Sequence, residues 1–123
     1  MKAELKSLAS IDIDERTYWP DIKDTFGFNI EASIGPEKGS SFDNFTFFVC
    51  TPQWIASKSI NQDFGDFGVF GRHMLVVAEY DWEKIRSMIE KLCAETTGKG
   101  WDEVAHRLAR FGMWEYEDHQ EIS

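Results

Sequence analysis

The sequence predicts an α+β fold, a mostly antiparallel four- to five-stranded sheet with two main helices packed on one face. Two observations predict it. Residues near the N-terminus alternate between apolar and polar with a period of two, and apolar residues nearer the C-terminus recur with the helical period of 3.6. No long linker divides the 123 residues, so a single domain over 1–123 is expected.

The strands are expected to come first. Residues 2–11 alternate weakly, whereas residues 26–34 place Phe, Ile and Ala on one face and Gly or polar residues on the other. Residues 35–41 have the composition of a turn, so residues 42–51 are expected to return as the antiparallel partner strand. That strand is expected to be central and covered on both sides, because residues 47–50 are apolar on both faces.

The remaining elements are mainly helical. Pro52 suits the first turn of a short helix, and residues 73–79 fit a fourth strand. Asp81 can cap a helix that carries apolar residues at 3.6-residue spacing. A second helix is expected over residues 101–111, followed by a terminal strand at residues 113–116.

The chain is acidic, with 22 Asp and Glu residues against 13 Lys and Arg residues and a formal net charge of −9. Many of the carboxylates lie outside the apolar segments, in residues 12–24 and 115–121. Basic residues are dispersed singly, whereas phosphate binding needs them clustered, so no direct nucleic-acid partner is expected. A basic protein would instead be attracted to this surface.

The chain is expected to act in the cytoplasm, without a membrane partner. Residues 1–6 alternate charged and apolar side chains, unlike a secretory signal, and no stretch approaches the ~20 apolar residues of a membrane span. Cys50 and Cys93 lie in apolar segments without metal-ligand spacing. They are therefore expected to be reduced thiols buried in the core.

Conventional catalytic side chains are scarce. The three His residues share no ligand spacing, so no metal, cofactor or catalytic residue is expected, and the protein is predicted not to be an enzyme. The alternative is a small enzyme in which Cys50 and His73 meet across two strands as a nucleophile pair. Packing is the favoured role for both residues, because they lie in apolar strand sequence without an Asn or Asp to orient the imidazole.

Residues 61–71 combine three Gly and three Phe residues. One interpretation is a loop held on the core by its aromatic rings. The other is an acidic contact loop in which Asp63 and Asp66 flank exposed aromatic anchors, as at many protein interfaces.

Four of the five Trp residues fall into two groups according to the segments in which they lie. Trp82 and Trp101 begin the two main predicted helices on their apolar faces, and both are expected in the core. Trp19 lies in an acidic irregular segment and Trp114 lies before the acidic tail, so these two are the expected interface aromatics.

Six short segments, spread over nearly the whole chain, carry a shared pattern. They are Phe26-Gly27-Phe28, Ile34-Gly35-Pro36, Val49 to Ile55, Tyr80-Asp81-Trp82, Gly100 to Glu103 and Trp114 to Asp118. Together they resemble the immunity protein 8 family of bacterial polymorphic toxin systems, most specifically through Cys50-Thr51-Pro52-x-Trp54. The resemblance implies a cytoplasmic antidote that binds and silences a cognate toxin domain.

Acidity and resemblance together predict an immunity protein that occludes the active site of a basic, nuclease-type toxin domain, because an acidic inhibitor can occupy a phosphate-binding cleft. The predicted partner-binding residues are Asp12, Asp14, Glu15, Trp19, Asp21, Asp63 and Asp66. The alternative to a toxin inhibitor is a scaffold or small-ligand-binding domain whose pocket is lined by Trp54, Phe64 and Phe67.

Overall fold

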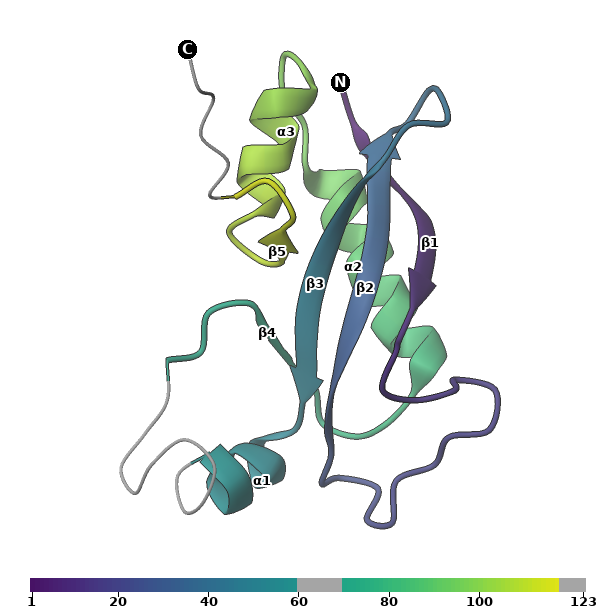
Figure 1. Ribbon diagram of the computed structural model, residues 1–123, viewed down its shortest axis with the longest axis vertical. Coiled ribbons are helices and arrows are strands. Elements are labelled where there is room, and N and C mark those ends of the chain that lie inside the picture. Colours follow the sequence, from purple (N-terminus) through teal and green to yellow (C-terminus); the bar gives the residue numbers. More distant parts are fainter. Residues whose placement is uncertain (60–69, 118–123) are drawn as a thin grey trace.

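A computed structural model describes residues 1–59 and 70–117, and Figure 1 shows how the elements are arranged. The strands are β1 (Ala3–Ala9), β2 (Gly27–Pro36), β3 (Asp43–Cys50), β4 (Met74–Val76) and β5 (Met113–Trp114). The helices are α1 (Pro52–Trp54), the π-helical turn η1 (Ile55–Ser59), α2 (Trp82–Glu95) and α3 (Trp101–Leu108). None of the helices in these two ranges is long and apolar enough to cross a membrane.

The five strands form one sheet in the order β1-β2-β3-β4, with β5 also paired to β3. The β1–β2, β2–β3 and β3–β5 pairs are antiparallel, which confirms the predicted mostly antiparallel α+β fold. β3 is central, as predicted, because β2 covers one of its edges while β4 and β5 share the other. At the β1 edge of the sheet, a bulge between Leu5 and Ser7 interrupts the pairing with β2.

The fourth strand differs from its prediction. The sequence indicated residues 73–79, but only Met74–Val76 form β4, and they run parallel to β3. His73, just before β4, has a φ of +67°, a left-handed conformation that His adopts more readily than most residues. After Val77 donates its N–H to the Cys50 carbonyl oxygen at 2.8 Å, the chain leaves the sheet toward α2.

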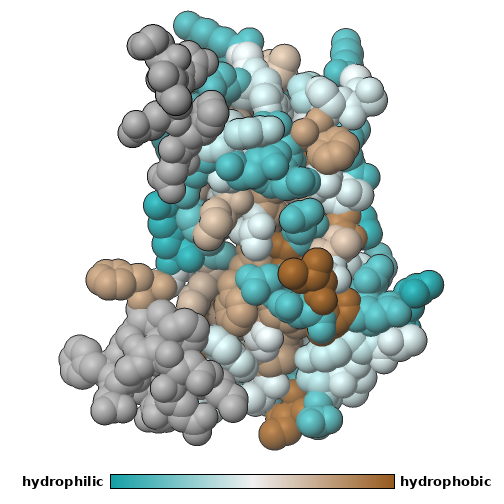
Figure 2. Space-filling model, viewed as in Figure 1, coloured by the Kyte–Doolittle hydropathy of each residue, from teal (hydrophilic) through white to brown (hydrophobic). Residues whose placement is uncertain are grey.

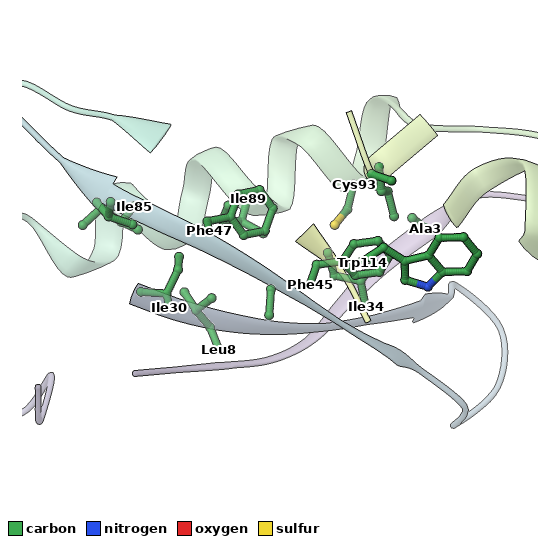
Figure 3. Close-up of a cluster of buried hydrophobic side chains, with 14 of the residues drawn as sticks. Ala3, Leu8, Ile30, Ile34, Phe45, Phe47, Ile85, Ile89, Cys93 and Trp114 are labelled. Carbon is green, nitrogen blue, oxygen red and sulfur yellow. The ribbon is translucent and has the colours of Figure 1, made fainter. Parts of the chain in front are cut away.

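The hydrophobic core lies between the sheet and the main helices, so these helices cover one face of the sheet, while most of the other face is left open by the described residues (Figure 1). Figure 3 shows Ile85, Ile89 and Cys93 on the side of α2 that faces Phe45 and Phe47 of β3. Each of these five residues is at most 2% exposed. Burying one Ile or Phe side chain stabilises a fold by roughly 1.5–3 kcal/mol, so this apolar face holds α2 on the sheet.

The two main helices begin where the sequence predicts. The Asp81 carboxylate caps α2 by accepting the backbone N–H of Lys84 at 3.1 Å. Asp102 and Glu103 lie in the first turn of α3 and Arg107 in its last, which suits the helix dipole at both ends. α3 ends at Leu108, three residues before the predicted end, and the chain continues in turns toward β5.

The junction between β3 and α1 is built around Thr51. Its hydroxyl oxygen accepts the backbone N–H of Trp54 at 3.3 Å, which caps α1, and the N–H of Phe26 at 3.4 Å. The Trp54 ring packs on Phe48 with centroids 4.8 Å apart. A Cβ atom at Gly27 would lie 2.7 Å from both rings, so this close approach requires glycine. Trp54 thus covers Phe48 on the face of β3 that points away from α2. This agrees with the prediction, made from residues 47–50, that the strand is covered on both faces.

Cys50 and Cys93 are free thiols buried in the fold, as predicted. Burial raises the pKa of Cys50 to about 11 and that of Cys93 to about 12, from an ordinary value of 9.0. The native state therefore favours the protonated thiols.

We expect the free energy of unfolding to fall as the pH rises above about 9, because both thiols ionise in the unfolded chain while they stay protonated in the native one. A thiol whose pKa is higher in the native state than in the unfolded chain stabilises the native state fully at pH values below its unfolded pKa. That stabilisation is lost as the pH rises from the unfolded pKa to the native pKa. Each thiol should add a slope of about 1.4 kcal/mol per pH unit between its two pKa values. Urea unfolding of the wild type, C50A and C93A across this range measures the slope; equal slopes in all three proteins would contradict the prediction.

Candidate partner-binding surface

Five of the predicted partner-binding residues lie on the loop that joins β1 to β2, residues 10–26. Figure 1 shows this loop at the end of the sheet where β2 begins, at the lower right of the view. The connection from β4 to α2, residues 77–81, meets the loop there, since Tyr80 donates its N–H to the Lys23 carbonyl oxygen at 3.2 Å. The fold therefore fixes the loop against a segment far later in the chain.

Two of the predicted acids hold the loop in shape. Asp12 Oδ2 accepts the N–H of Asn29 at 2.8 Å, which ties the loop to β2. Asp14 accepts the backbone N–H of Arg16 at 3.0 Å and two guanidinium hydrogen bonds from the same residue at 3.1 Å. These bonds hold the pKa of the Asp14 carboxyl below its usual value. The charge of Asp14 is thus already paired within the chain.

An aromatic cluster supports the loop. Tyr80 is 5% exposed, and its ring meets those of Tyr18, Trp19 and Phe26 edge to face, with centroids 5.0, 5.8 and 5.8 Å apart. Such pairs contribute about 0.5–1.5 kcal/mol each beyond their buried area. Trp19 is held by this cluster, yet 63% of the residue is exposed. It is therefore a supported aromatic side chain presented to solvent.

A hollow of 640 Å³ opens beside Trp19, between the loop and the start of α2. Its lining residues are Glu15, Arg16, Trp19, Lys23, Glu79, Tyr80, Asp81, Trp82, Glu83 and Arg86. Two of these, Glu15 and Trp19, are predicted partner-binding residues. Trp, Tyr and Arg are also the residue types that carry most of the binding energy at protein interfaces.

The charges around this hollow are only partly paired. Lys23 Nζ lies 3.3 Å from the Glu79 carboxylate and 5.9 Å from the centroid of Trp19, a cation–π arrangement. Within residues 1–59 and 70–117, the side chains of Glu15, Glu83 and Arg86 make no hydrogen bond or ion pair. Two unpaired carboxylates against one unpaired guanidinium leave the hollow anionic on balance, which suits a positively charged partner.

Tyr80 is a residue that sequence reasoning missed. Its hydroxyl oxygen is buried and finds no hydrogen-bond partner in the described part of the chain, an arrangement that costs stability. Burial raises the pKa of Tyr80, and the charges of Tyr18, Glu15 and Asp81 raise it further. No periodicity or spacing links Tyr80 to the loop, because their contact arises only when the chain folds.

Of the other predicted partner-binding residues, one is described by the structure and two are not. Asp21 is exposed on the loop; burial, together with the charge of Asp21, raises the pKa of Tyr18. Asp63 and Asp66 lie outside the described residues, as do Phe64 and Phe67 of the alternative ligand pocket.

The nucleophile pair of the alternative enzyme site is not assembled. Cys50 pairs with Val76 in the β3–β4 register, whereas His73 precedes β4. His73 Nε2 instead lies 3.2 Å from the Ala109 carbonyl oxygen and 3.5 Å from the Glu117 carboxylate. The imidazole is thus engaged away from a thiol whose raised pKa already disfavours the reactive thiolate.

Trp114 is buried, whereas the sequence predicted an exposed interface aromatic. Trp114 is 8% exposed and stacks on Phe45 with centroids 6.4 Å apart. Its Nε1 donates to Asp43 Oδ2 at 3.0 Å, and Trp101 Nε1 donates to the same oxygen at 2.8 Å. A buried indole needs an acceptor for its N–H, and Asp43 supplies one from a position 71 residues earlier.

A family model described as immunity protein 8 matches residues 3–119 of this chain, in agreement with the resemblance carried by the six short segments. Comparisons with curated proteins and with solved structures gave no match. The matched range includes the loop of residues 10–26, the junction at Thr51 and both main helices.

Proposed function

This chain belongs to the immunity protein 8 family, and we propose that it neutralises its cognate toxin in the cytoplasm by binding a basic toxin domain and occluding the active site. Family membership implies a toxin partner, and the mechanism proposed is inhibition by contact. We place the contact at the Trp19 surface, defined as the loop of residues 10–26 together with the hollow beside Trp19. Asp63 and Asp66 are proposed to extend this contact.

The observation that carries this proposal is the exposure of Trp19 on a fixed aromatic base. A single exposed Trp is common on a protein surface and needs no functional explanation. Here, however, the ring centroids of Trp19 and Tyr80 lie 5.8 Å apart, and a hollow opens beside Trp19. A preformed anchor loses little side-chain entropy on binding, so more of its contact energy appears as affinity. Glu15 and Asp21 next to this anchor would guide a basic partner toward it.

The distribution of charge supports a basic partner. Residues 82–110, which form α2, α3 and their connection, carry six basic and five acidic side chains. The rest of the described chain, residues 1–59, 70–81 and 111–117, carries seven basic and 13 acidic side chains, so within the described residues the negative charge belongs to the sheet and its loops. A toxin domain that binds nucleic acid needs a basic surface, and such a surface would be attracted to the sheet and loops rather than to the helices.

Co-expression with the toxin domain encoded beside this chain tests the proposal. We expect cell survival and a stable complex on a sizing column. Survival without a complex would contradict inhibition by contact and favour an enzymatic or indirect mechanism. Toxicity that persists despite folded protein would overturn the pairing and return the small-ligand or scaffold alternative.

Replacement of Trp19 by Ala is expected to weaken toxin binding about 30-fold, which corresponds to about 2 kcal/mol for the loss of an aromatic anchor. The matched control is Phe42→Ala, because Phe42 is a 51% exposed aromatic residue before β3, at the opposite end of the sheet. Calorimetric titration with the toxin domain measures both. Equal losses, or no loss in W19A, would remove Trp19 from the interface.

A further inference from the structure

The open face of the sheet, opposite α2 and α3, carries ordered rows of side chains. One row crosses four strands, because Ala9 pairs with Glu31, Glu31 with Thr46, and Thr46 with Met113. The next row on the same face joins Ser7, Ser33 and Asn44. At its end Glu115 accepts the Asn44 N–H at 2.9 Å through its carboxylate. Side chains two positions apart on a strand share a face, so these rows form one surface.

This surface is hollowed between β2 and β5. A hollow of 420 Å³ is lined by Glu31, Asn44, Thr46, Met113, Trp114, Glu115 and Glu117. Met113 is 52% exposed in a surround of carboxylates, hydroxyls and amides. Figure 2 looks onto this face, where hydrophilic side chains predominate. An apolar side chain ringed by polar groups is the arrangement of an interface core and rim.

The charge of this hollow is of one sign. Among the residues that the structure describes, its lining contains three carboxylates and no Lys, Arg or His side chain. Glu117 is paired with Arg72, whereas Glu31 and Glu115 have no cationic partner in the described part of the chain. A second copy of this acidic face would be repelled, so the charge selects a basic occupant.

We propose that this open face is a second docking surface, which receives a segment of the toxin domain that carries Lys or Arg. The proposal rests on the proposed function and adds a second contact to it. Basic side chains of that segment face Glu31 and Glu115, and an apolar side chain packs on Met113, which lies in the same row as Glu31.

The test compares two charge reversals that change the net charge equally. Glu31→Lys places a cation in the hollow, and Glu90→Lys places one on the exposed side of α2. Stopped-flow association with the purified toxin domain at low and high salt gives the rate constants. We expect Glu31→Lys to slow association about tenfold at low salt and Glu90→Lys less than about twofold, because steering depends on local charge.

The outcomes separate the two proposals. Equal slowing by both variants would show that only net charge acts, and would overturn the docking surface while leaving toxin neutralisation intact. Met113→Ala adds a salt-independent readout: we expect dissociation about fivefold faster, and an unchanged rate would also count against the surface. Failure of the wild type to bind the toxin domain would overturn both proposals. Circular dichroism of each variant checks that the fold is kept.

Discussion

Asp43→Ala is expected to lower the free energy of unfolding by about 3 kcal/mol, because the substitution leaves two indole N–H groups without their shared acceptor. Trp101 and Trp114 donate to the same carboxylate oxygen at 2.8 and 3.0 Å, and Trp114 is 8% exposed. Hydrogen bonds to a charged acceptor contribute more than neutral ones. The loss should loosen α3 and β5 together, since Asp43 joins both elements to β3.

Asp43→Asn is the matched control for this prediction. Its amide oxygen occupies the same place and can accept both indoles, but without a charge, so a loss of about 1 kcal/mol is expected. Guanidinium unfolding followed by Trp fluorescence gives both values. If Ala and Asn at this position destabilise equally, the bridge contributes through the charge of the carboxylate rather than through the presence of an acceptor oxygen.

Gly35→Ala is expected to destabilise the fold by about 3 kcal/mol or to shift the register of the β2–β3 turn. A Cβ atom at Gly35 would lie 1.9 Å from the carbonyl oxygen of Ser41 and 3.0 Å from the Cα atom of Phe42. Both neighbours are backbone atoms, so no side-chain rotation relieves the overlap. The Ile34-Gly35-Pro36 segment of the family pattern therefore has a steric reason for its glycine.

Gly100→Ala provides the comparison for Gly35→Ala. Gly100 precedes α3 with an extended backbone, φ −148°, and a Cβ atom there would meet no atom of the described residues within 4 Å. Loss of less than about 1 kcal/mol is expected. Thermal unfolding of the two variants measures the difference, and a Gly35→Ala protein as stable as Gly100→Ala would contradict the steric argument.

The sheet could be predicted from the sequence where one strand face is fully buried. β2 alternates apolar and polar residues along its length, and only one register buries Ile30, Ala32 and Ile34 together. β4 could not be predicted in the same way, because its three residues pair in parallel with β3 through contacts that local sequence does not encode. Helix starts were predictable through the cap at Asp81, whereas the end of α3 was not.

The candidate site was predictable only in part. Trp19 stands in an acidic segment without apolar periodicity, so its exposure followed from the sequence. Tyr80 and Arg86 join Trp19 at the hollow from other elements, and no local pattern foretells such a meeting. For Trp114 the prediction of exposure failed. Its acidic neighbours suggested a surface position, but the distant carboxylate of Asp43 accepts its indole N–H and so allows its burial. The count of acidic residues also overstated the charge that Asp14 offers to a partner, because its carboxylate is paired with Arg16.

The two edges of the sheet are poorly suited to one mode of partner binding, the addition of a strand. On one side the bulge in β1 breaks the row of free backbone groups, and on the other the edge of β3 is divided between the three residues of β4 and the two of β5. β-augmentation, in which a foreign strand extends a sheet, needs a long straight edge. Short or bulged edges also resist sheet-to-sheet aggregation. The described edges therefore favour a complex formed through faces and loops over one formed by strand addition, and they disfavour polymerisation of this protein edge to edge.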